Sequence, residues 1–304
     1  MKNLKTLLLM LVAGVLLSAC GTTSTVPITG RKHRLNYDDA TLLSLSTQQY
    51  QQYMGQVKVS TNATQTALVK KVGQKLANAV NNYLVNNGYA SDAANFAWEF
   101  NLVQDNQVNA FCMPGGKIIV YEGLLPVTQD EPSLAIVLGH EIAHAVAKHS
   151  AEQMTKSDNS STLLNIGSSI ATAVLGNNAA TQIGTSVAQQ GLTLLNLKYS
   201  RNHESEADYM GLIFAAMAGY DPQVALTFWQ RMAASSTASN PEWMSSHPSD
   251  EKRISDLQKH MPEALAVYRQ YSGASTVPAT TTKSTKSKSS SSKKQGGLGF
   301  TIGK

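Results

Sequence analysis

The stretch of sequence that decides the fold is Leu134–Ser150, which reads LAIVLGHEIAHAVAKHS. Its apolar residues recur every three or four positions, which is the period of a helix with a buried face. Residues 140–144 of this stretch read HEIAH. Because residues four apart lie one above the other on a helix, His140 and His144 can offer two ring nitrogens to one metal ion.

Zinc is the metal that this spacing favours, because it accepts nitrogen ligands in a small tetrahedral shell. Glu141, one step along the helix, would flank the metal and take a proton from a water molecule that the metal activates. The alternative is that the two histidines only pack or cap the helix. A metal site would need one more protein ligand, since catalytic zinc sites hold three and leave one position open.

Candidates for the third ligand lie on a later predicted helix, over residues 201–217. Glu204 is followed four residues later, on the same face, by Asp208, and this pair suits a ligand plus a carboxylate that holds a metal-binding histidine. Glu206 points to another face of the helix. Spacing alone does not separate Glu204 from Glu206, and any of these acids can instead be a solvated surface charge.

The charge of the chain gives no reason to expect a nucleic-acid partner. The net charge is +5 over 304 residues, but residues 272–304 hold six lysines and residues 1–20 hold two, with no acid in either segment. Without these eight lysines the rest of the chain carries −3. The basic isoelectric point is therefore a property of the two ends.

The N-terminus has the pattern of a secretory signal, because Lys2 and Lys5 precede a short apolar run over residues 7–17. Residues 17–20, LSAC, resemble a bacterial lipobox, in which the chain is cut before the cysteine and Cys20 is acylated. An ordinary signal peptide with an incidental cysteine is the alternative. Acyl chains on Cys20 would hold the protein at a membrane surface.

Composition divides the chain into four parts. Residues 1–19 are expected to be the signal, and residues 20–36 the lipidated cysteine and a tether rich in Thr, Pro and Gly. Residues 37–271 are expected to form one domain. Residues 272–304 contain mainly Ser, Thr, Lys and Gly, cannot bury a core and are expected to be disordered.

Periodicity predicts a mostly helical domain with a small sheet. Besides the central helix, helices are expected over residues 40–54, 68–86, 201–217 and 248–260. Strands are expected over residues 98–102, where apolar and polar side chains alternate, and over Lys117–Tyr121, which follows a Pro-Gly-Gly turn. Residues 160–195, rich in small side chains, are expected to form two closely packed helices, with a lid or membrane-contacting flap as the alternative.

Four separated segments resemble the HtpX and CAAX-prenyl-protease family of zinc metallopeptidases, peptidase family M forty-eight. They are NAFCMPGGKIIVYEGLL (109–125), GHEIAHAVAKHS (139–150), SRNHESEAD (200–208) and HPSDEKRI (247–254). The pattern is most similar to soluble or lipid-anchored members from bacterial envelopes and mitochondria. The pattern of predicted elements indicates an α+β, zincin-like fold in a single domain, mostly helical, with a small antiparallel sheet beside the helix that carries HEIAH.

The resemblance also assigns roles to the candidate residues. It implies that His140 and His144 bind one zinc ion and that Glu141 is the general base. In the family's E-x-x-x-D pattern the first acid is the third metal ligand, which selects Glu204, with Asp208 behind it as a supporting carboxylate.

The His-Pro element at residues 247–254 resembles one that approaches the zinc in this family. It implies that His247 stabilises the oxyanion, or occupies the water position and holds the enzyme latent. Arg253 would steady the same loop or the substrate. His149 lies nine residues after His140, about half a turn out of phase on an ideal helix, and is interpreted as structural.

The strand after the Pro-Gly-Gly turn resembles the family's substrate-binding edge strand. An extended peptide would add to Lys117, Ile118 and Ile119 as one more strand, held by main-chain hydrogen bonds with little demand on sequence. Asn109 matches a recurrent family position nearby. The expected partners are therefore unfolded or extended polypeptides and, through Cys20, a membrane surface.

These residues and the resemblance predict a metalloendopeptidase that hydrolyses peptide bonds of misfolded or misassembled envelope proteins. The alternative is an envelope chaperone or assembly factor with latent protease activity, which would hold clients along the same strand. The expected location is the bacterial cell envelope, lipid-anchored and facing the periplasm. Gly21 after the cysteine favours the outer membrane.

Overall fold

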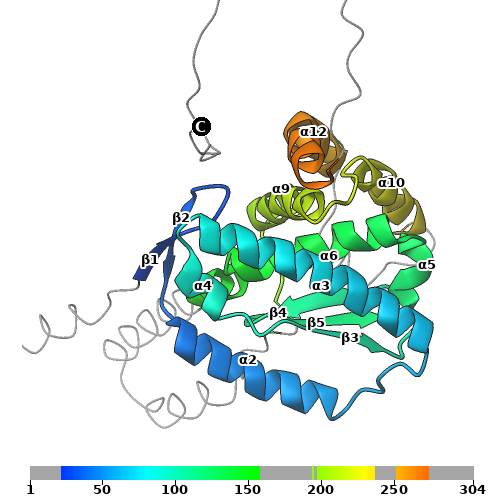
Figure 1. The fold of residues 1–304 in the computed structure, drawn as a ribbon. Helices are drawn as coiled ribbons and strands as arrows, with labels where there is room; N and C mark the ends of the chain where they lie inside the picture. The colour runs from blue at the N-terminus through cyan, green and yellow to red at the C-terminus, as the bar shows by residue number, and fades with distance from the viewer. Residues whose placement is uncertain (1–21, 158–193, 195–196, 237–250, 274–304) are drawn as a thin grey trace, which may run out of the picture.

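The computed structural model describes residues 22–157, 194, 197–236 and 251–273 (Figure 1). The strands are β1 (Thr22–Thr25), β2 (Lys32–Leu35), β3 (Glu99–Val103), β4 (Ala110–Met113) and β5 (Lys117–Tyr121). The helices are α2 (Asp39–Met54), α3 (Ala63–Asn86), α4 (Ala90–Ala94), the 3-10 turn η1 (Glu122–Leu124), α5 (Leu125–Thr128), α6 (Glu131–Val146), α9 (Arg201–Met217), α10 (Val224–Ser236) and α12 (Glu251–Tyr271). The fold is α+β and zincin-like, as expected, with helices around two small sheets.

The larger sheet has the strand order β3-β5-β4. β5 runs parallel to β3 and antiparallel to β4, so the sheet is mixed and not antiparallel as expected. β5 is the central strand, which corrects its assignment as an edge. The physical reason is in the sequence KIIVY, because a continuous apolar run is typical of a strand that is buried on both faces.

The two faces of this sheet pack on different helices (Figure 1). Phe100, Leu102, Ile118 and Val120 face α3 and α6 and belong to the main core. The alternate residues of the same strands face α2, where a second cluster includes Leu42, Tyr50, Ile119 and Tyr121. The sheet is therefore a buried layer between helices, and α6 lies directly behind β4.

α6 is the central helix of the molecule, with all but three of its sixteen residues buried. Asp130 caps its N-terminus by accepting a hydrogen bond from the Ser133 amide, and Pro132 occupies the first turn, where a missing amide is harmless. The helix ends at Val146, and Lys148 then adopts a left-handed conformation with φ of 55°. This turn changes the direction of the chain before His149.

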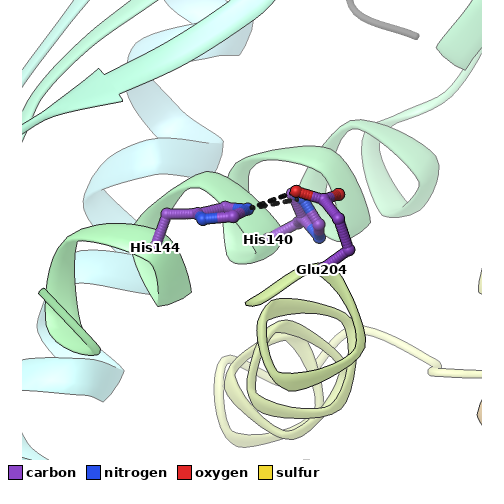
Figure 2. Close-up of side chains that lie close together, drawn as sticks. All are labelled: His140, His144 and Glu204. Carbon is purple, nitrogen blue, oxygen red and sulfur yellow. Dashed lines mark hydrogen bonds and ion pairs between the residues drawn. The ribbon is translucent and has the colours of Figure 1, made fainter. Parts of the chain in front are cut away.

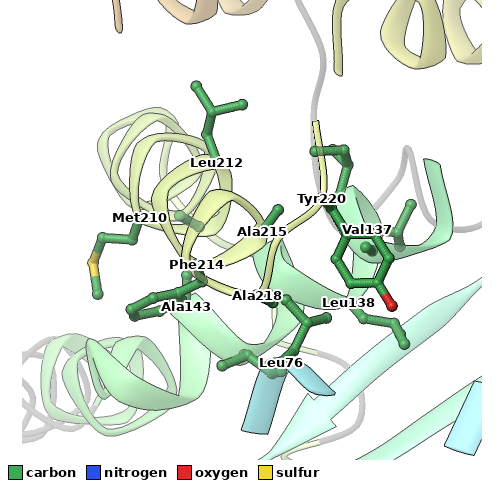
Figure 3. Close-up of a cluster of buried hydrophobic side chains, with 14 of the residues drawn as sticks. Leu76, Val137, Leu138, Ala143, Met210, Leu212, Phe214, Ala215, Ala218 and Tyr220 are labelled. Carbon is green, nitrogen blue, oxygen red and sulfur yellow. The ribbon is translucent and has the colours of Figure 1, made fainter. Parts of the chain in front are cut away.

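α9 packs on α6 at a contact between backbones (Figure 3). A Cβ added at Gly211 would lie 2.7 Å from the His140 amide nitrogen, and one added at Gly139 would lie 2.7 Å from the Gly211 carbonyl oxygen. Around this crossing Figure 3 shows Ala143 of α6 beside Phe214 of α9, both buried. The glycines therefore bring the two helices close enough to share one site.

Two sequence-based expectations are corrected by the described residues. Residues 20–36 are not only a tether, because β1 and β2 pair as an antiparallel hairpin whose tip buries Val26 and Ile28 in the main core. α12 continues past the expected end at residue 260, through Pro262, because its apolar residues continue to pack on the core.

Other expectations fall on residues that are not described. These are the signal over residues 1–19, Cys20, residues 160–193, His247 and residues 274–304. Within the described part of the chain, no helix has both the length and the apolar character needed to cross a membrane.

Candidate metal centre

Three buried side chains meet between α6 and α9 (Figure 2). The Nε2 atoms of His140 and His144 lie 3.0 Å apart. The two carboxylate oxygens of Glu204 lie 3.5 Å from these nitrogens, one from each ring. Each side chain is at most 2% exposed, so the cluster is shielded from bulk water.

This donor set fits a zinc ion. Two imidazoles and one carboxylate form a usual catalytic zinc site, and all three ligand atoms lie within 4.8 Å of one another. The surroundings also favour positive charge at this point. Burial would lower the pKa of His140, but hydrogen bonds to Asp208 and Glu204 outweigh burial and raise it to about 9.

His140 is supported from behind by Asp208 and Arg253. Its Nδ1 lies 2.9 Å from Asp208 Oδ1, and Arg253 donates two hydrogen bonds of 2.6 Å to the same carboxylate. Burial would raise the pKa of Asp208, but the charge of Arg253 and the bond to His140 outweigh burial and hold it below its usual value. Asp208 is thus ionised and fixes the orientation of the His140 ring.

Arg253 occupies a different environment from the one expected. It is 4% exposed, stacks 3.7 Å from the centre of the Trp229 ring and lies 3.4 Å from Glu204. It therefore contacts the metal-binding carboxylate and its neighbour from inside the protein. These contacts place Arg253 beside the candidate metal ligands, and its expected role, to steady the loop or the substrate, stays a prediction.

His144 is supported by a residue that sequence reasoning treated as merely structural. His149 Nδ1 lies 2.9 Å from His144 Nδ1, and His149 Nε2 lies 2.9 Å from Glu206. An ideal helix would have carried His149 away from the site, but the left-handed turn at Lys148 brings it back. Burial lowers the pKa of His149 to about 4, so the ring is neutral.

Glu141 follows His140 on α6 and is 1% exposed. Burial raises the pKa of Cys112 and of Tyr199, and the negative charge of Glu141 adds to the rise in both. α6, which carries Glu141, also contacts β4. Sequence reasoning did not identify Tyr199, whose ring stacks on His144 at 4.1 Å, because no motif marks it.

The expected substrate-binding residues lie on the central strand β5 or next to it. Ile118 and Ile119 are completely buried, and Lys117 pairs with Glu99 and donates to the Ala97 carbonyl. These three residues therefore do not form a free edge. Asn109 precedes β4, and its carbonyl accepts a hydrogen bond from the Tyr121 amide.

Comparison with known proteins gives a family and several relatives. The model of peptidase family M48 matches residues 42–261. Mitochondrial metalloendopeptidase OMA1 of Arabidopsis thaliana is 38% identical over 182 residues, which cover 59% of this chain and 35% of that protein. Metalloendopeptidase OMA1, mitochondrial, of Homo sapiens is 30% identical over 258 residues, which cover 79% and 46%. Beta-barrel assembly-enhancing protease of Yersinia pestis is 31% identical over 190 residues, which cover 60% and 37%.

Two consequences follow from these relatives. The chain spans half or less of the length of these curated relatives. The expected location, a lipid-anchored position facing the periplasm at the bacterial outer membrane, is contradicted, because relatives with up to 38% identity are mitochondrial proteins.

Proposed function

Because the chain belongs to peptidase family M48, we propose that it is a zinc-dependent endopeptidase whose active site is the cluster of His140, His144 and Glu204. The observation that carries the proposal is the meeting of these three buried side chains from two helices, with Glu141 buried next to His140 on α6. Each has the ligand atom and the burial that a catalytic zinc site requires.

Each residue of the site has a distinct role in this proposal. A zinc ion held by the three side chains would act as a Lewis acid, lowering the pKa of a water molecule and polarising the scissile carbonyl. Glu141 would take the proton of the attacking water and pass it to the leaving amine. His247 keeps its predicted role as oxyanion donor or latency residue, which depends on the resemblance of residues 247–254 alone.

The substrate would be an extended polypeptide bound along β4. Among the described strands, only β5 pairs with β4. The Tyr121 amide bonds to Asn109, so Asn109, Phe111 and Met113 share their main-chain bonds with β5. The amide and carbonyl groups of Ala110 and Cys112 therefore point away from β5, toward the open edge of β4, which is the edge that no other described strand pairs with.

Two further observations favour β4 over the other edge of the sheet. The outer edge of β3 is already covered, because Ser60 donates to the Leu102 carbonyl and Gln104 donates to the Lys58 carbonyl. β4 also contacts α6, and Cys112 lies within the electrostatic reach of Glu141. A peptide added to β4 would thus pass the general base while main-chain bonds hold it, a mode that suits unfolded or misassembled substrates.

The proposal is tested by measuring zinc content and casein cleavage on the same preparations of the chain. Glu141→Gln should keep one zinc per chain and lose cleavage, because the amide cannot accept the proton. Glu131→Gln, at the start of the same helix, is the matched control and should cleave as the parent does. Cleavage by Glu141→Gln at the parent rate would disprove the base, and absence of zinc from the parent would disprove the site.

A second candidate function is a holdase or assembly factor with latent proteolysis. It is favoured by the relative from Yersinia pestis, whose name is beta-barrel assembly-enhancing protease. The open edge of β4 would serve both functions. If the Glu141→Gln variant suppresses aggregation of an unfolded client as well as the parent does, binding without cleavage accounts for the activity. If suppression is lost with cleavage, proteolysis accounts for it.

A further inference from the structure

The two metal-binding histidines are supported in different ways. His140 contacts the Asp208 carboxylate directly, whereas His144 contacts a second imidazole, His149, which in turn contacts Glu206. We infer that His149, Glu206 and Arg31 form a positioning relay, through which the N-terminal hairpin β1–β2 fixes the His144 ring and completes the metal centre. This inference rests on the metal site of the proposed function.

The hydrogen atoms along this relay can be counted. His144 can bind a metal through Nε2 only if its single ring hydrogen lies on Nδ1, from which it donates to His149 Nδ1. His149 accepts at Nδ1 and must therefore carry its own hydrogen on Nε2, which donates to Glu206. Each contact then has one donor and one acceptor. The relay thus selects the tautomer in which His144 Nε2 is free to bind a metal ion.

The hairpin holds both oxygens of Glu206. Thr29 donates a 2.6 Å hydrogen bond to one oxygen, and Arg31 Nε donates a 2.8 Å hydrogen bond to the other. Arg31 also pairs with Glu152 at 2.9 Å, which keeps the guanidinium in place. Glu206 thus presents one fixed oxygen to His149.

The hairpin tip is itself anchored in the core. Val26 is 1% exposed and Ile28 is 6% exposed, and the Val26 amide donates to the Arg31 carbonyl across the tip. The tip therefore cannot rotate without exposing apolar surface. The hairpin precedes residues 42–261, which match the family model, so the metal centre draws support from outside that segment.

The test measures zinc affinity by chelator competition and the visible absorption of the cobalt-substituted chain. His149→Phe keeps a ring against His203 and Tyr199 but removes the hydrogen bonds to His144 and Glu206. We expect it to weaken zinc binding about 10- to 100-fold and to shift the cobalt spectrum. His149→Asn retains a polar atom near the position of Nδ1. It should recover part of the zinc affinity and part of the parent cobalt spectrum.

The hairpin end of the relay is tested separately. Arg31→Met keeps much of the side-chain volume and removes the hydrogen bonds to Glu206, and we expect a smaller loss of zinc affinity in the same direction. Arg34→Gln, an exposed change on the same hairpin, is the matched control and should bind zinc as the parent does. Thermal unfolding of the metal-free proteins identifies any variant that has lost the fold. The zinc affinities of the variants that still fold then test the relay.

The outcomes separate this inference from the proposed function. Parent-like zinc affinity and cobalt spectra in folded His149→Phe and Arg31→Met would overturn the relay and leave the metal site intact. A parent chain that binds no zinc would overturn both. Loss of affinity in Arg34→Gln equal to that in Arg31→Met would show that the hairpin acts through its fold and not through Glu206, which also overturns the relay.

Discussion

Asp208 determines both the orientation of His140 and the neutralisation of Arg253. Asp208→Asn would leave His140 without an anionic acceptor and Arg253 with a buried charge lacking its main partner. We expect zinc affinity to fall about 10- to 100-fold and the free energy of unfolding to fall by about 3 kcal/mol. Chelator competition and urea unfolding measure these two effects.

The matched control for this change is Asp256→Asn. Among the described residues, Asp256 pairs with Lys252 and Lys259 of its own helix, whose side chains are exposed, and such contacts contribute little. Asp256→Asn should leave both the zinc affinity and the free energy of unfolding unchanged. Equal zinc affinity in Asp208→Asn and Asp256→Asn would show that Asp208 does not support the ligand.

Glu152 makes stability depend on pH. Burial would raise its pKa, but hydrogen bonds to His203, His33 and Lys156 outweigh burial and hold it far below its ordinary value of 4.5. Because the folded pKa is depressed, the stabilisation is present above pH 4.5 and decreases as the pH falls below that value. Glu152→Gln should therefore cost about 2 kcal/mol at pH 7, and less at pH 4. Urea unfolding at both pH values checks this, and a cost that is the same at both would contradict it.

At the scale of residues, spacing predicted the ligands of α6 but not the rest of the site. The four-residue spacing of His140 and His144 is fixed by the helix, so the prediction needed no tertiary knowledge. Glu204 and Glu206 are equally good by spacing, and only packing on α6 turns one to the metal centre and the other to His149. His149 was interpreted as structural, and its contact with His144 was not predicted because the helix ends before it, at a left-handed lysine that no local pattern predicts.

The crossing of α6 and α9 makes the metal centre sensitive to a single methyl group. In Gly211→Ala the new Cβ would meet the backbone of His140 at 2.7 to 2.8 Å, and backbone atoms cannot move aside alone. α9 would have to move away from α6 and would carry Glu204 with it. We expect a loss of about 1–3 kcal/mol in the free energy of unfolding, together with weaker zinc binding.

Gly55→Ala provides the control for the added methyl group. Its Cβ would lie 3.5 Å from the nearest carbonyl oxygens, an ordinary contact, and the residue has a φ of −71° that alanine adopts freely. Urea unfolding and chelator competition on both variants distinguish a general effect of alanine from the effect of a methyl group at the crossing of α6 and α9. Parent-like zinc affinity in Gly211→Ala would show that the two helices tolerate separation.

At the scale of elements, helices were predicted better than the order of strands. Asp38, Asn62, Asp130 and Ser200 each accept a hydrogen bond from an amide in the first turn of their helix, and such caps are visible in the sequence. The order β3-β5-β4 depends on which strands pair, and a strand's own residues do not specify its neighbours. The four residues of β4 were too few to predict a strand at all.

At the scale of the whole molecule, the metal centre combines the hairpin, α6, α9 and α12. Motifs in residues 140–144, 200–208 and 247–254 identified three of these parts, α6, α9 and the start of α12. The hairpin could not be predicted, because residues 22–30 hold only Val26 and Ile28 as large apolar side chains among Thr, Ser, Pro and Gly. Their burial depends on a surface that only the assembled helices provide.

Metal removal should therefore destabilise the whole molecule and not only its active site. Zinc held by His140, His144 and Glu204 would link α6 to α9, and an ion that binds only the folded chain adds about 4 kcal/mol when its free concentration is 1,000 times its Kd. For a domain of this size, a chelator should lower Tm by roughly 8–16 °C, and zinc should restore it. Magnesium at the same concentration is the control, because it prefers oxygen ligands and should not restore Tm.

Hydrogen exchange locates the effect within the molecule. After metal removal, amides of α6 and α9 should exchange faster, because the link between these helices is lost while the sheet and α2 keep their own cluster of Leu42, Tyr50 and Ile119. A Tm that does not depend on zinc, with unchanged exchange in α6 and α9, would mean that packing alone holds the two helices together. In that case the glycine crossing, and not the metal, would fix the distance between Glu204 and the two histidines.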